Sequence, residues 1–105
     1  MAIVAVSISP VGEGISVSRH VAAALRVARA QKRVKVVLDS MFTTLEGDLD
    51  EVMALVREMQ EAVFESGAER VSSVIKVDDR RDRSATMQDK LRAVEALLED
   101  DPEKT

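Results

Sequence analysis

Residues 42–67 read FTTLEGDLDEVMALVREMQEAVFESG, a stretch that holds a strand, a helix and the signals that separate them. Asp48, followed three residues later by Glu51, is a variant of the capping box that starts helices, and Gly67 stands where a left-handed C-terminal cap belongs. The stretch therefore predicts a strand over 42–46 that leads into an amphipathic helix. The apolar residues expected to form the buried stripe of that helix are Leu49, Val52, Met53, Val56 and Val63.

The sequence on either side predicts three more strands. Residues 2–9, AIVAVSIS, alternate between two faces and are rich in β-branched side chains, and 34–38 and 71–78 have the same character. Asp39 and Ser40 follow the strand over 34–38 and predict a tight hairpin into the next strand.

Two more helices are predicted from apolar residues at helical spacing. One begins near Ser16, with Ser16 or Ser18 as its N-cap, and the other begins near Ser84 or Thr86. The earlier helix is expected to bury Val17, Val21, Ala24, Leu25 and Ala28. The later helix is expected to bury Met87, Leu91, Val94 and Leu98.

The order of elements is strand, helix, strand, strand, helix, strand and an extra C-terminal helix. This order predicts an α+β fold, the ferredoxin-like βαββαβ sandwich, in which a four-stranded antiparallel sheet has its first and third strands in the centre. A chain of 105 residues has room for one core. We therefore expect a single domain over 1–98, including the C-terminal helix, and a polar tail over 99–105.

The composition narrows the classes of partner. The formal net charge is -4 and the sequence pI is about 5.0, so no electrostatic reason exists to bind a phosphate backbone, and we expect no nucleic acid partner. The chain has no cysteine, which excludes disulfides and thiolate chemistry. The apolar start of the chain is too short to span a bilayer and lacks the features of a signal peptide, so we expect no membrane partner and a cytoplasmic location.

No motif predicts catalysis or metal binding. His20 is the only histidine, and His chemistry needs an orienting partner, so a packing or surface role is expected. Gly12 and Gly14 follow a strand but match neither common phosphate-loop pattern, which favours a turn with positive φ. The run DDRRDR over 78–83 can pair its own charges and is expected to be a solvated turn. We therefore expect no enzyme and no cofactor.

Alternation along the strands assigns two faces to the sheet. The face expected to meet the helices carries Val4, Val6, Ile8, Thr43, Leu45, Val71, Ile75 and Val77. The opposite face, called the open face below, carries Ile3, Ala5, Ser7, Ser9, Phe42, Thr44, Glu46, Ser72, Val74, Lys76 and Asp78. Its apolar part, to which Val37 adds, is too hydrophobic to leave in water, so we expect a second copy of the chain to cover it.

The polar part of the open face has two interpretations. A carboxylate, hydroxyls and a lysine beside an interface could hold a small molecule that has a flat apolar body and hydrogen-bonding groups. The same side chains could instead be ordinary solvent-facing strand residues.

Taken in order, the segments VGEGISVSRHVA, MFTTLEGDLDEV, AVFESGAERV and IKVDDRRD resemble the MTH1187/YkoF-like family of thiamine-binding proteins (UPF0045) over nearly the whole chain. The resemblance implies a ferredoxin-like fold, subunits paired through extended sheets, and a homodimer or homotetramer. It also implies binding of thiamine or its hydroxymethylpyrimidine part near subunit contacts, without chemical turnover. The alternative is a structural or regulatory oligomer that acts through a protein partner and binds no vitamin.

The family's T-T-x-E-G segment falls on Thr43, Thr44, Glu46 and Gly47. A carboxylate suits the exocyclic amine or the thiazolium of thiamine, and Glu46 is the residue assigned to it. The complete set of ligand-binding residues expected is Ser7, Ser9, Phe42, Thr43, Thr44, Glu46 and Lys76. Phe42 departs from the small residue expected there and either stacks on the ligand or fills part of its pocket. Asp39 and Ser40 replace an expected His-Pro-like pair.

Overall fold

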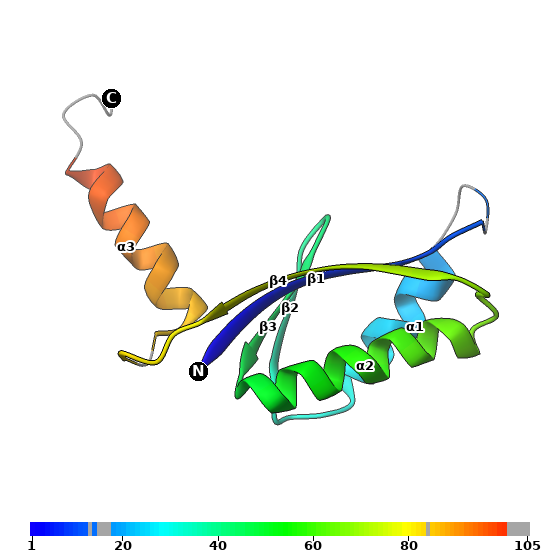
Figure 1. The fold of residues 1–105 in the computed structure, drawn as a ribbon. Helices are drawn as coiled ribbons and strands as arrows, with labels where there is room; N and C mark the ends of the chain where they lie inside the picture. The colour runs from blue at the N-terminus through cyan, green and yellow to red at the C-terminus, as the bar shows by residue number, and fades with distance from the viewer. Residues whose placement is uncertain (13, 15–17, 84, 101–105) are drawn as a thin grey trace.

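One antiparallel sheet and two helices on one of its faces form the body of the protein (Figure 1). The computed structural model describes residues 1–12, 14, 18–83 and 85–100. The elements are β1 (Ala2–Pro10), α1 (Ser18–Arg29), β2 (Lys35–Leu38), β3 (Thr43–Gly47), α2 (Leu49–Glu65), β4 (Val71–Asp79) and α3 (Met87–Glu99). The strand order β2-β3-β1-β4, with β1 and β3 in the centre, confirms the predicted ferredoxin-like α+β fold and its extra C-terminal helix.

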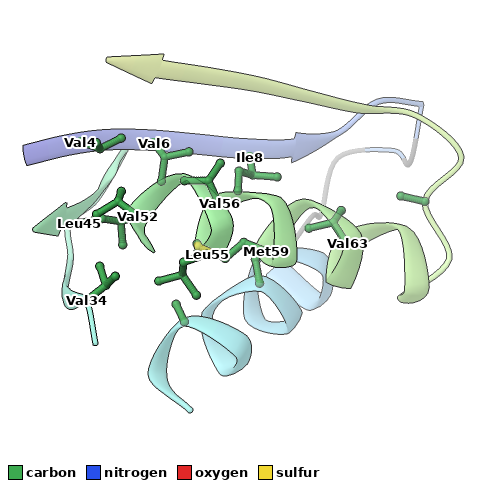
Figure 2. Packing of buried hydrophobic residues seen from close by; sticks show 13 residues of the cluster. Val4, Val6, Ile8, Val34, Leu45, Val52, Leu55, Val56, Met59 and Val63 are labelled. Atoms are coloured by element: carbon green, nitrogen blue, oxygen red, sulfur yellow. The ribbon is translucent and has the colours of Figure 1, made fainter. Parts of the chain in front are cut away.

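The core lies between the sheet and the two helices (Figure 2). On β1, alternate residues are buried because they point toward α2, and Val4 lies opposite Leu45 in the register of β1 with β3. The buried residues of α2 are Val52, Leu55, Val56, Met59, Ala62 and Val63. Leu55, Met59 and Ala62 were missed, Leu49 is only partly buried, and Met53, which is exposed, was wrongly included. The buried arc is wider than one stripe because α2 packs against α1 as well as the sheet.

The two ends of α2 have the predicted caps. Asp48 Oδ2 accepts a hydrogen bond from the Glu51 amide at 3.3 Å, and Gly67 follows the helix with a φ of 114°. His20 is buried, with its Nδ1 2.5 Å from Ser66 Oγ at the C-terminal cap. His20 is therefore a packing residue that ties α1 to the end of α2.

The connection between β2 and β3 is longer than predicted. The amide of Asp39 donates to the carbonyl of Phe42 at 3.1 Å, so the turn covers residues 39–42 and Phe42 lies outside the strand. Ser16 and Ser84, which were predicted as possible starts of the first and last helices, are outside the described residues. Thr86 is the N-cap of α3 and forms a capping box with Asp89.

The expected burial of α3 is wrong beyond its first turn. Met87 is buried, whereas Leu91, Val94 and Leu98 are 56%, 57% and 50% exposed. The reason is the length of the sheet, whose last paired rows contain Ala2 and Ile3 of β1. The first turn of α3 lies over this end of the open face, and the following turns project past it (Figure 1).

One edge of the sheet is also less covered than predicted. The register places Ile75 and Val77 of β4 opposite Val6 and Val4, which is the face expected for them. Both side chains are nevertheless exposed, while Val71 packs against the core. The two helices therefore leave this part of the edge strand bare.

Candidate ligand site

The candidate site exists because β1 is longer than β3. The pairing of β3 with β1 ends at Thr43 opposite Val6, but β1 continues along β4 as far as Pro10. From Ser7 onward, β1 therefore has no strand neighbour on its β3 side. Backbone N–H and C=O groups that point to this side have no ladder partner, which makes the strand end a natural place for a ligand to hydrogen-bond.

The gap beside the end of β1 forms a pocket of about 180 Å³, which we call the strand-end pocket. Its walls come from the end of β1, from α1, from Met59 of α2 and from the loop between β2 and β3. The apolar lining residues are Val6, Ile8, Val21, Ala24, Leu25, Leu38, Met41, Phe42 and Met59. The polar ones are Ser7, Ser9, Asp39, Ser40 and Thr43.

The polar groups of the strand-end pocket have unused hydrogen-bonding capacity. The hydroxyls of Ser7, Ser9, Ser40 and Thr43 make no hydrogen bond to any other residue in the described part of the chain. Asp39 Oδ1 accepts from the Ser40 amide at 2.7 Å, which leaves Oδ2 available. By the alternation of β1, Ser7 and Ser9 offer their hydroxyls from the open-face side of the strand end, opposite Val6 and Ile8. A carboxylate oxygen, hydroxyls and an apolar wall can bind a small ring that has amine and ring-nitrogen groups.

The structure separates the predicted site residues into two groups. Ser7, Ser9, Phe42 and Thr43 line the strand-end pocket. The remaining three, Thr44, Glu46 and Lys76, do not line it. The register explains the separation of Glu46, which lies opposite Ile3, six residues from Ser9 and about 20 Å away along β1. Thr44 and Lys76 flank Ala5, nearer to the strand end.

Glu46 has a structural partner at the far end of the sheet. Its side chain is buried, and Oε1 accepts a hydrogen bond from the Met87 amide at 3.0 Å. Since the first amides of a helix lack intrahelical acceptors, this carboxylate caps α3 from another element. Lys90 of α3 pairs with Asp78 of β4 beside it.

Asp39 and Ser40 are the polar residues of the strand-end pocket that were not predicted as ligand-binding residues from the sequence. Their only sequence signal was the departure from the His-Pro-like pair expected at that place. Because a turn residue reaches a pocket only through the fold of its loop, the departure could not be read as a binding feature from the sequence.

A second hollow of about 400 Å³ lies under the start of α3. Its lining residues are Met1, Ile3, Asp78, Arg80, Ala85 and Lys90. The charges there are already paired, Lys90 with Asp78 and Arg80 with Asp82, and these contacts lower the pKa of Asp78 and bring that of Asp82 to about 2. The predicted local pairing of the DDRRDR run is thereby confirmed, and this hollow offers fewer available polar groups than the strand-end pocket.

Residues 1–12, 14, 18–83 and 85–100, which the structure describes, bear on two further functions, metal binding and membrane insertion. This part of the chain contains no cluster of His, Cys, Asp and Glu that could hold a metal ion. Among the same residues, no helix has the length and apolar character needed to cross a membrane.

The ferredoxin-like sheet with its helices places the chain among small α+β proteins. A family model described as Thiamine-binding protein matches residues 4–95, and the chain belongs to this family. A UPF0045 protein of Staphylococcus xylosus is 41% identical over 104 residues, which is 95% of this chain and 97% of the relative. The UPF0045 protein YqgV of Bacillus subtilis is 37% identical over 94% of this chain and 99% of its own.

Solved structures agree with this family membership. The crystal structure of the hypothetical protein MJ1052 from Methanocaldococcus jannaschii has a TM-score of 0.82 and 38% identity. The match covers 90% of this chain and 95% of that one. The resemblance stated from the sequence motifs is thus confirmed.

Proposed function

We propose that this protein binds the aminopyrimidine ring of thiamine, or free hydroxymethylpyrimidine, in the strand-end pocket and does not convert it chemically. The observation that carries the proposal is the set of unpartnered hydroxyls and the available Asp39 oxygen around an apolar wall. Membership of the thiamine-binding protein family supports the same ligand. The proposed setting is the cytoplasm.

The size of the pocket favours one ring over two. A volume of about 180 Å³ is below the roughly 300–1,000 Å³ typical of sites for drug-sized ligands. We therefore assign the pyrimidine to the pocket and place the thiazolium of thiamine at its mouth. Asp39, on the exposed loop, is suited to the exocyclic amine or to the cationic ring.

The proposal includes self-association, as a homodimer or homotetramer. Val37 and Val74 on the open face are exposed. On β1 the half-buried Ala5 lies in the same row as Val37, beside the row of Ser7 and Val74, and half-buried Ile3 lies in the next row of this face. An apolar strip of this kind is typical of surfaces covered by another subunit.

The test is calorimetric titration of thiamine and of hydroxymethylpyrimidine into wild type, Asp39→Asn and Asp50→Asn. Asp39→Asn should weaken binding of thiamine by about tenfold to a hundredfold, the loss expected for a charged hydrogen bond of about 1.5–3 kcal/mol. Asp50→Asn makes the same charge change on an exposed position of α2 outside the pocket and should leave affinity unchanged.

A ligand that binds only the folded protein must also raise its melting temperature. Wild type that shows neither heat of binding nor thermal stabilisation at millimolar thiamine or hydroxymethylpyrimidine would contradict the proposal. That result would favour the alternative of a structural or regulatory oligomer that acts through a protein partner.

A further inference from the structure

Helix α3 carries an apolar stripe that its own chain leaves in water. Leu91, Val94 and Leu98 lie on the face that begins with buried Met87, and each is at least half exposed, while Leu97 beside them is 73% exposed. A helix of 13 residues is marginally stable in water without packing. Among the described residues, the bonds that hold α3 to the sheet lie at its start, at Met87 and Lys90, and the sheet ends beneath its first turn (Figure 1).

The open face of the same chain is an uncovered surface of matching size. Its own α3 covers only the end at Ile3, and Val37 and Val74 remain exposed farther along the sheet. From Ile3 to Ser9 the face is about 20 Å long, and a 13-residue helix is also about 20 Å long.

The charges on the two surfaces are complementary. Lys35 and Lys76 project from the open face and have no ion-pair partner among the described residues. After Arg92, α3 and its C-cap carry only acidic charges, Glu95, Glu99 and Asp100, which also lack ion-pair partners among the described residues. At 100° per residue, Glu95 borders the apolar stripe.

We infer that α3 of one subunit lies over the open face of a second copy of this chain, and that the second copy returns its own α3 in the same way. The exchange covers both apolar surfaces with one two-fold symmetric contact. The accessible surface of 7314 Å² exceeds by roughly 1,500 Å² that of a typical monomer of 11.5 kDa. This excess is larger than the ~800 Å² that each partner buries in a stable interface. The inference rests on the self-association proposed above and specifies its contact.

Cross-linking of the unaltered protein tests the arrangement. Unlabelled and isotope-labelled chains are mixed, treated with a zero-length carbodiimide that joins carboxylates to amines, digested and analysed by mass spectrometry. We expect mixed-label links from Glu95 or Glu99 to Lys35 or Lys76. If every cross-link between these glutamates and lysines joins two peptides with the same label, the inference is overturned.

Matched variants test the apolar stripe by sedimentation. Leu91→Glu should raise the dissociation constant of the assembly by about tenfold or more, because a carboxylate would be buried there without a partner. Ala96→Glu adds the same charge on the opposite side of α3 and should keep the wild-type mass.

The possible results separate this inference from the proposed self-association. A wild-type monomer at tens of micromolar would contradict both. A wild-type oligomer whose mass is unaffected by Leu91→Glu, or whose intersubunit links join only one α3 to another, would overturn the exchange alone.

Discussion

Glu46 is a residue whose sequence context and structural position point to different roles. The family segment assigned it to the ligand, whereas its buried carboxylate accepts the Met87 amide of α3. A buried carboxylate is stable when hydrogen bonds replace its hydration, and the unpaired first amide of a helix supplies such a bond. The residue thus connects the central strand β3 to the start of α3.

Replacement of Glu46 separates the structural role from the binding role. Glu46→Ala leaves the Met87 amide without an acceptor and should lower the free energy of unfolding by about 1–3 kcal/mol. Glu46→Gln keeps an acceptor oxygen and should lose less. Denaturant unfolding measures both variants.

Titration of thiamine into Glu46→Gln then tests the position of the ligand. Affinity equal to wild type is expected, since Glu46 does not line the strand-end pocket. A tenfold or greater loss would instead place the ligand at the Glu46 end of the sheet, as first assigned from the sequence.

Phe42 is the only aromatic residue that lines the strand-end pocket. If its ring stacks on the pyrimidine, Phe42→Gly should weaken binding by about twofold to tenfold, the equivalent of roughly 0.5–1.5 kcal/mol, and we expect this outcome. Phe64→Ala, which removes the other phenyl ring from the exposed side of α2, is the control. Calorimetry that shows tighter binding to Phe42→Gly would mean that the ring crowds the pocket.

At the scale of elements, the start of α3 depends on ionised carboxylates. A backbone hydrogen bond from Thr86 lowers the pKa of Asp89, and a hydrogen bond from Lys90 lowers that of Asp78. Both pKa values fall below the ordinary value of 3.8 given for Asp. Deprotonation of Asp78 and Asp89 therefore favours the docked position of α3. The stability that these two carboxylates give is fully present above about pH 4 and is lost as the pH falls through their lowered pKa values.

Acid should consequently loosen α3 before the core unfolds. Amide hydrogen exchange across α3 should accelerate as the pH is lowered from about 5 to about 2, relative to exchange in α2 and after correction for the intrinsic pH dependence. Asp89→Asn, which cannot ionise, should show a shallower change. Identical pH profiles for this variant and wild type would contradict the role of the Asp89 carboxylate.

At the scale of the whole molecule, the main feature is the apolar surface that the single chain leaves exposed. The apolar part of the open face, the stripe of α3 and the exposed apolar residues of β4 cannot all be covered by α1 and α2, which lie on one side of the sheet. Assembly is the means by which such surfaces leave water.

A charge on the open face should therefore oppose assembly. Val74→Glu should produce smaller species in sedimentation, because the carboxylate would be buried in the contact without a partner. Met53→Glu, on an exposed position of α2, adds the same charge away from this face and should keep the wild-type mass. If Val74→Glu also keeps that mass, the open face is not the intersubunit surface.

The sequence by itself determined the order of elements, the central position of β1 and β3, and the faces of the strands. The elements and the strand faces depend on local rules: the alternation of Val4, Val6 and Ile8, the cap at Asp48 and the positive φ of Gly67 each act within a few residues. The central position of β1 and β3 follows from the βαββαβ order of those elements. The family resemblance rested on the same local segments.

Only the tertiary structure decided where α3 lies and which polar residues share a pocket. Both depend on the relative lengths of strands that are distant in the sequence. From Ser7 onward β1 continues beyond the end of β3, and this opens the strand-end pocket. The sheet ends at Ala2, so the later turns of α3 have no strand to pack against. Periodicity identifies the apolar side of a helix, as it does for the side of α3 that carries Leu91 and Val94. It does not say which surface, or which copy of the chain, covers that side. Periodicity also does not give the strand register, and it is the register that places Glu46 opposite Ile3, far from Ser9.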